Sequence, residues 1–255
     1  MPPLRLKVIA CEIALREICF AAARSPSVVD LDFLPQGLHD TPGQGRDEIQ
    51  RRVDAVPAAK YDAILIGYGL CSSILKELHA PHTRLIIPRA HDCITFFLGS
   101  KERYQQCFSA RPGTYYFTSG WLEVPKRRAA EASAGHGTFL PARTLSVASE
   151  EYRRWVEKFG EDQARYLLEV MGDWANHYTH GTLIDFDFTR PLDCQAEVQR
   201  ICHEKGWQFE ALPGDLGLLQ RWLDGQWPAE EFLIVAPGEK VVPSFDDQII
   251  TSTPA

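Results

Sequence analysis

The sequence predicts an α/β fold: a mainly parallel sheet flanked by helices in Rossmann-like layers, followed by a smaller C-terminal α/β lobe. Two observations predict it. Short, continuous apolar runs such as AILIGYGL (63–70) and RLIIPRA (84–90) are typical of strands that are covered on both faces. Segments with apolar residues at helical spacing separate these runs, and this alternation indicates parallel strands joined by crossover helices.

Taken in order along the chain, the elements follow from these two patterns. The clearest strands are expected over 6–11, 63–70, 84–90, 182–188 and 231–238, with weaker candidates over 27–35 and 206–214. Helices are expected over 12–23, 46–56, 72–79, 101–109, 149–174 and 192–206. The stretch PGTYYFTSGW (112–121) predicts a hairpin or strand, because Tyr, Phe and Thr favour β-structure.

One segment interrupts the alternation and suggests a boundary. Residues 125–143 are rich in Ala, Gly and basic residues and lack a clean period, which is typical of a loop or insertion. We therefore expect an α/β lobe over 1–124 that carries the candidate site, a loop or insertion over 125–148, and a C-terminal helical and α/β lobe over 149–255.

Composition excludes several classes of protein. With 45% hydrophobic and 24% charged residues the chain resembles ordinary globular domains, and its net charge of −7 argues against nucleic-acid binding. The sequence contains no run of 18 apolar residues, so no membrane span is expected. The N-terminus lacks the features of a signal peptide. We expect a cytoplasmic protein whose seven cysteines are free thiols, and no nucleotide-binding motif is found.

Three cysteines occupy equivalent places in the predicted sheet. Cys11 ends the first strand, Cys71 follows the strand 63–70, and Cys93 follows the strand 84–90. Because open parallel sheets bind ligands outside the carboxyl ends of their strands, these three side chains are expected to converge. The other four cysteines lie in helical patterns, where a free cysteine is usually a small buried apolar group.

The histidine beside Cys93 adds a nitrogen donor. His91 lies two positions earlier, so both side chains would point to one side of an extended chain. Imidazole with thiolates suits zinc or iron. The sequence thus predicts a metal site of Cys11, Cys71, His91 and Cys93, with Glu12 and Asp92 as candidate acid–base residues, Asp92 alternatively orienting a metal ligand.

Further polar and aromatic residues surround these ligands in the sequence. Gly67, Gly69 and Ser72 belong to a turn that opens a predicted helix, where backbone N–H groups favour negative charge. We expect cofactor contacts from Gly67, Gly69, Ser72, Arg89 and Lys101, and substrate contacts from Tyr68, Tyr115 and Trp121. Simpler interpretations stay open: Arg89 could pair with Asp92, Lys101 could be solvated, and the aromatic residues could belong to the core.

Several of these motifs together are similar to a known family. They are VIACEIALREI, LIGYGLCSSIL, IIPRAHDCITFFLGSKERY, PGTYYFTSGWLE and, later, LPGDLGLLQRWLDGQWPAEEFLIVAPGEKV. The chain resembles the bacterial and archaeal family catalogued as domain of unknown function 1638 over nearly its whole length. The resemblance implies no assigned reaction. It implies a context of one-carbon metabolism, with a corrinoid protein or methyltransferase as an expected partner.

Three functions remain open at this stage. The first is a zinc-dependent enzyme or methyl-transfer component of corrinoid-linked metabolism, in which zinc acts on a small-molecule substrate as a Lewis acid. The second is an iron–sulfur protein with three cysteine ligands and an open iron. The third is a non-catalytic accessory protein that binds or delivers a metal or small ligand. If the protein is an enzyme, a metal-dependent transferase or lyase is expected.

Overall fold

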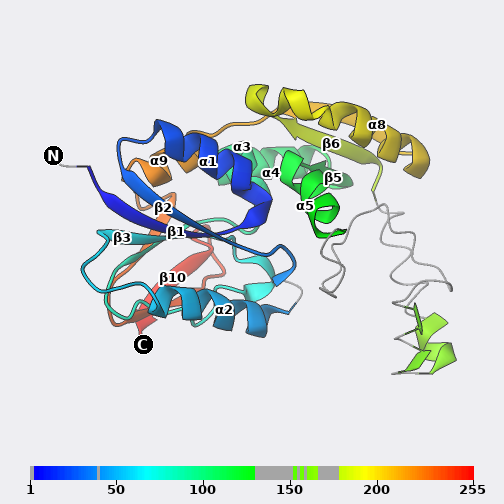
Figure 1. The fold of residues 1–255 in the computed structure, drawn as a ribbon. Helices are drawn as coiled ribbons and strands as arrows, with labels where there is room; N and C mark the ends of the chain where they lie inside the picture. The colour runs from blue at the N-terminus through cyan, green and yellow to red at the C-terminus, as the bar shows by residue number, and fades with distance from the viewer. Residues whose placement is uncertain (1–2, 39–40, 130–151, 154–155, 158–159, 166–177) are drawn as a thin grey trace.

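The computed structural model describes residues 3–38, 41–129, 152–153, 156–157, 160–165 and 178–255. Most of the helix predicted over 149–174, and most of the insertion predicted over 125–148, lie outside the described residues. The rest forms a mixed α/β structure with a mainly parallel central sheet, shown in Figure 1. None of the helices in these ranges is long and apolar enough to cross a membrane.

The central sheet has five strands in the order β2-β1-β3-β4-β8. Their bounds are β1 Arg5–Cys11, β2 Val28–Leu34, β3 Ala63–Gly67, β4 Leu85–Pro88 and β8 Phe232–Val235. The first four strands run parallel, and β1 pairs with β2 on one side and β3 on the other. All residues of β3 and β4 are buried, which explains their uninterrupted apolar sequences.

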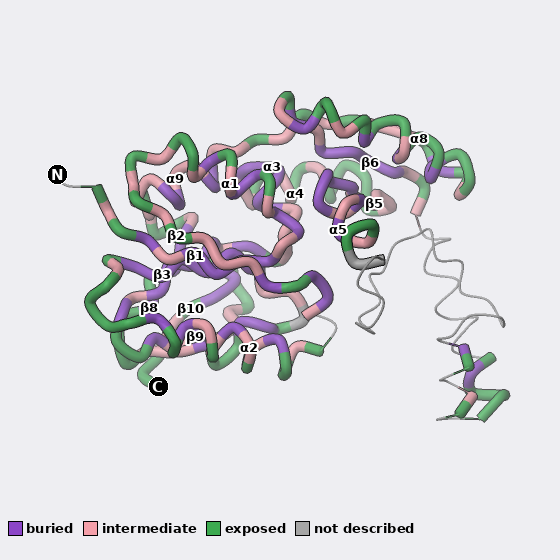
Figure 2. Tube along the Cα trace, in the orientation of Figure 1, coloured by how far each residue is buried: buried purple, intermediate pink, exposed green. Residues whose placement is uncertain are grey.

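Helices and a hairpin cover both faces of this sheet. The elements are α1 (Leu15–Arg24), α2 (Pro42–Asp54), α9 (Gly217–Leu223), β9 (Glu239–Pro243) and β10 (Ile250–Pro254). In Figure 1, α1 and α9 lie on one face, whereas α2 and the β9–β10 hairpin lie on the other. Figure 2 shows the result: the buried part of the trace runs through the strands between these layers.

A second, smaller parallel sheet has the order β5-β6-β7. Its strands are β5 (Thr114–Phe117), β6 (His180–Asp185) and β7 (Gln208–Pro213), and α8 (Cys194–Lys205) packs on it. This sheet buries its own apolar cluster around Phe117, Val198 and Trp207. Between the sheets lie α3 (Ile94–Leu98), α4 (Lys101–Ala110) and α5 (Ser119–Ala129).

Two sequence predictions are wrong in detail. Strand β8 was expected to be parallel, but it pairs antiparallel with β4. The predicted helix over 72–79 is only a short 3-10 turn, η3 (Cys71–Ser73), followed by turns. Ser73 and Glu77 both have positive φ, at 66° and 68°, which a right-handed helix excludes. Over 112–121, where a hairpin or strand was expected, the strand alternative is confirmed: the segment contains β5, followed by the start of α5.

A buried carboxyl group links α1 to α5. Glu17 of α1 is 0% exposed; its Oε1 accepts a hydrogen bond from Ser119 Oγ of α5 at 3.0 Å, and its Oε2 has no partner. Burial raises the pKa of Glu17 to about 7, although the Ser119 hydrogen bond opposes the shift. A carboxyl that resists ionisation in the folded state links stability to pH.

Replacing Glu17 by Gln should raise stability above neutral pH. In the unfolded chain Glu17 ionises near its usual pKa of 4.5, whereas in the folded protein it holds its proton up to about pH 7. Stability should therefore fall between these pH values and then level off, by up to about 3 kcal/mol. Urea unfolding of wild-type protein and Glu17→Gln at pH 5 and pH 8 measures this difference.

Glu48 offers a matched control on the surface of α2. Hydrogen bonds from Arg51 lower the pKa of Glu48, so its contribution to stability is present above its usual pKa and is lost at lower pH. Glu48→Gln should thus be slightly less stable than wild type at pH 8. A Glu17→Gln variant that loses stability at pH 8 would contradict the buried, protonated state of Glu17.

Candidate functional site

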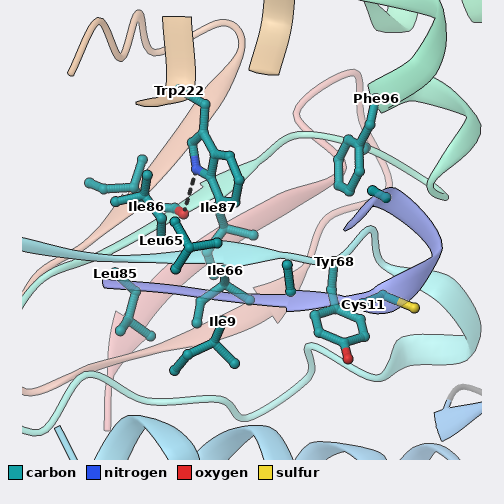
Figure 3. Close-up of a cluster of buried hydrophobic side chains, with 14 of the residues drawn as sticks. Ile9, Cys11, Leu65, Ile66, Tyr68, Leu85, Ile86, Ile87, Phe96 and Trp222 are labelled. Carbon is teal, nitrogen blue, oxygen red and sulfur yellow. Dashed lines mark hydrogen bonds between the residues drawn. The ribbon is translucent and has the colours of Figure 1, made fainter. Parts of the chain in front are cut away.

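Three cysteines from three strand ends line one cavity of about 380 Å³. Cys11 is the last residue of β1, Cys71 follows β3, and Cys93 follows β4. Figure 3 shows Cys11 and Tyr68 at the end of the strands, beyond the apolar side chains of the sheet. The cavity thus brings together the three thiols that the strand-end rule selected.

The position of the cavity in the sheet follows from strand order. The chain leaves β1 to form β2 on one side, and later forms β3 on the other side of β1. This reversal opens a crevice at the carboxyl ends of β1 and β3, where ligands bind in open α/β sheets. Cys11 and Gly67 end these two strands, and both line the cavity.

Two paired loops bring Cys71 and Cys93 together. Leu70 N donates to Ala90 O at 2.8 Å, and Cys71 N donates to His91 O at 2.9 Å. Gly69 makes this pairing possible, because a Cβ there would lie 2.7 Å from Asp92 Cα and 2.9 Å from Asp92 N. The glycine predicted to contact a cofactor also lets the two loops approach.

The Cys71 thiol is buried among groups with opposing effects. Burial, and next the charge of Asp92, raise the pKa of Cys71 to about 12, whereas hydrogen bonds from backbone amides at Cys93 and Gly69 lower it. Burial and the nearby Cys71 thiolate raise the pKa of Cys93 well above its usual value. Without a compensating cation, ionisation of one of these thiols therefore opposes ionisation of the other.

Asp92 lies beside the cysteines and is held by two donors. Tyr104 Oη donates to its Oδ2 at 2.7 Å, and Ile94 N donates to its Oδ1 at 2.9 Å. Burial raises the pKa of Asp92, and the hydrogen bond from Tyr104 opposes the shift. Asp92 lines the cavity, so its carboxyl is the candidate for moving a proton there.

Glu12, the other candidate acid–base residue, does not line the cavity. Its Oε1 accepts a hydrogen bond from Gln36 N at 2.8 Å, and its Oε2 lies 3.9 Å from Arg127 Nη2. Glu12 therefore positions the loop after β2. Gln36 itself does line the cavity, and it was absent from the predicted site residues. The strand-end rule could have identified it, because Gln36 lies two residues beyond the end of β2.

Aromatic side chains make up much of the cavity lining. The lining aromatic residues are Tyr68, Tyr104, Phe108, Tyr115, Tyr116, Trp121 and Tyr178. Trp121 Nε1 donates to Tyr115 Oη at 2.9 Å, and the rings of Tyr104 and Tyr116 pack edge to face. Tyr68, Tyr115 and Trp121, the predicted substrate contacts, all belong to this lining, as do Gly67 and Gly69.

His91 lies elsewhere. Its side chain is exposed and lines a neighbouring depression together with Lys101, Gln105 and Asp247. Lys101 Nζ donates there to Asp247 O at 2.8 Å, and Ser100 Oγ caps α4 by accepting from Arg103 N. The predicted metal ligand His91 and the predicted cofactor contact Lys101 thus lie outside the lining of the cysteine cavity.

Arg89 is bound to main-chain carbonyl groups. Its Nε donates to Ala229 O at 2.7 Å, and its Nη1 donates to Gln248 O at 2.9 Å and also to Ile250 O. These bonds tie the end of β4 to the C-terminal hairpin. Burial lowers the pKa of Arg89. Ser72, a further predicted contact, has its backbone in η3, and its side chain lies outside the described part of the structure.

Metal ligation itself remains a prediction. In the described residues, no group of three or more His, Cys, Asp or Glu side chains has the arrangement to hold a metal ion. The three cysteines share a cavity without that grouping. Their side chains would have to turn towards a common centre to bind one.

Comparison with known proteins gives one match. The family model described as "Protein of unknown function (DUF1638)" matches residues 33–223 and confirms the resemblance drawn from the sequence motifs. Searches of curated proteins and of solved structures found no match. The chemistry must therefore be argued from the cavity.

Replacing Gly69 by Ala should separate the paired loops. The new Cβ would meet the Asp92 backbone below 3.0 Å, so the expected loss of stability is about 2 kcal/mol. Reaction of the thiols with an aromatic disulfide should become faster. Gly43→Ala in α2 is the control, because nothing lies within 4 Å of its added Cβ. Equal stabilities for the two variants would contradict the close approach.

Replacing Arg89 by Met should destabilise the hairpin rather than the cavity. The apolar stem is retained, but the hydrogen bonds to Ala229, Gln248 and Ile250 are lost, at an expected cost of about 2 kcal/mol. Amide hydrogen exchange in β9 and β10 should accelerate. Arg51→Met removes an arginine from a surface ion pair and should cost under about 1 kcal/mol. Unchanged exchange in Arg89→Met would refute the structural role.

Proposed function

The chain belongs to the DUF1638 family, which carries no assigned reaction, and from the site alone we propose that it is an iron–sulfur enzyme acting on a small organic molecule. In this proposal Cys11, Cys71 and Cys93 hold one cluster and leave an iron open towards the aromatic cavity. The observation that carries the proposal is that these three thiols, from three strand ends, line a single cavity.

The donor set favours a cluster over a zinc ion. The argument for zinc depends on a nitrogen ligand from His91, which is exposed and lines a different depression. Sulfur is therefore the shared donor around the cavity, and thiolates are the usual ligands of iron–sulfur clusters. A cluster also attaches each cysteine to a different iron atom, so its ligands need not gather round one point.

Backbone hydrogen bonds to sulfur support the same assignment. Amide groups at Cys93 and Gly69 favour the thiolate of Cys71. Such hydrogen bonds are among the factors that set the reduction potential of a cluster. The parallel order β2-β1-β3-β4, with helices on both faces, further supports a Rossmann-like interpretation of this lobe, with its site at the strand ends.

The residues of the chain divide the remaining work. A cluster held by Cys11, Cys71 and Cys93 would supply Lewis acidity to an oxygen of the substrate. Asp92, beside Cys93 and hydrogen-bonded by Tyr104, is the group that accepts or returns a proton. The aromatic wall of Tyr115, Tyr116 and Trp121 holds the organic part of the substrate and excludes water. This division fits a lyase or a transferase.

Each of Cys11, Cys71 and Cys93 should be required for metal loading. Protein purified without oxygen should be brown and contain iron and acid-labile sulfide. Single Cys→Ser changes at these three positions should reduce both to background. Cys107→Ser is the matched control, because Cys107 lies on α4 and does not line the cavity. It should leave the iron content unchanged.

The result also discriminates between metals. If the protein is colourless and holds one zinc ion whose binding requires the same cysteines, the bound metal is zinc and not an iron–sulfur cluster. Protein without either metal, or equal loss of iron in Cys107→Ser, would refute the proposal. Circular dichroism of each variant separates loss of metal from loss of fold.

A further inference from the structure

The charge of the cavity lining restricts the ligand. None of the described residues that line it is Lys, Arg or His, and its charged side chain is that of Asp92. A carboxylate or phosphate would therefore enter without a side-chain cation to balance it. Burying an unpaired charge is costly, so the cavity disfavours anions.

Two residues of the lining each carry a buried polar atom without a hydrogen-bond partner. Gln36 is 3% exposed and Tyr68 is 5% exposed, and neither Gln36 Oε1 nor Tyr68 Oη forms a hydrogen bond. Glu12 fixes Gln36 by accepting from its backbone N–H at 2.8 Å. A buried amide oxygen needs a donor, and leaving it unpaired costs free energy. A ligand with an N–H group would satisfy it.

The aromatic wall favours a positive charge. The polar atoms of Tyr104 and Trp121 are engaged, because Tyr104 Oη donates to Asp92 and Trp121 Nε1 donates to Tyr115 Oη. A ligand would therefore contact mainly the rings of Tyr104, Tyr116 and Trp121. Ring faces of Trp and Tyr attract ammonium groups, most strongly where water is excluded.

We propose that the substrate of this cavity is a small organic ammonium ion that carries at least one N–H. Its N–H donates to Gln36 Oε1, its charge is balanced by Asp92 and the rings of Tyr104, Tyr116 and Trp121, and anions are rejected. The assignment rests on the proposed function only in taking this cavity as the substrate site. Gln36 is the residue that distinguishes amines with N–H groups from fully substituted ones.

A set of probes of one chain length tests the charge requirement. Butylammonium, butanol and butyrate carry charges of +1, 0 and −1, and isothermal titration calorimetry compares their binding to the full chain. Butylammonium should bind about tenfold more tightly than butanol, and butyrate should not bind measurably. Butanol or butyrate binding as tightly as butylammonium, or no binding of any probe, would overturn the proposal.

A second comparison tests Gln36. Butyltrimethylammonium keeps the charge but has no N–H, so it should bind more weakly than butylammonium. Gln36→Leu should weaken butylammonium about tenfold and leave butyltrimethylammonium unchanged. Gln105→Leu, the same substitution in the neighbouring depression, should affect neither. Equal effects of Gln36→Leu on both cations would refute the hydrogen bond.

The titrations are made on metal-free and on metal-loaded protein, with iron content measured in the same samples. Butylammonium that binds protein incapable of loading metal would sink the iron–sulfur assignment and retain the ammonium site. Protein that loads iron through the three cysteines but shows no preference for butylammonium would refute the ammonium site and retain the iron–sulfur assignment.

Discussion

The site depends on the pairing of two loops at the carboxyl ends of β3 and β4. Two backbone hydrogen bonds, from Leu70 to Ala90 and from Cys71 to His91, hold the loops together, and Gly69 packs directly on the Asp92 backbone. Because parallel strands end at a common edge, this contact fixes Cys71 beside Cys93. The cavity, the aromatic wall and the second sheet are arranged around that edge.

The same contact explains why a histidine two residues from a cysteine does not share its site. The prediction for His91 assumed that the chain stays extended beyond β4, so that alternate side chains face one way. The strand instead ends at Pro88, and Cys93 already has helical φ and ψ of −67° and −17° at the start of α3. The alternation is lost at this turn, and His91 faces solvent.

Much of the fold was predictable because buried strands have a strong sequence signal. The runs that became β3 and β4 are apolar along their length, those that became β1 and β6 are apolar in part, and the strand-end rule then selected Cys11, Cys71 and Cys93. The direction of β8 was not predictable, since an apolar run reads the same for either pairing. Gln36 was missed because β2 is half-exposed and gave a weak signal, although the same strand-end rule applies to it.

The charges around the cavity bear on both the cysteine thiols and the aromatic residues of the lining. Burial raises the pKa of both Cys71 and Cys93, so these two thiols can be buried side by side as neutral groups. In the proposed metal-bound state the three cysteines would be thiolates, and their negative charge would add to that of Asp92, which also lines the cavity. The proposed cluster would offset only part of the charge of three thiolates. The remaining negative charge would favour a cationic ligand, and the Tyr and Trp rings of the lining favour the same sign of charge.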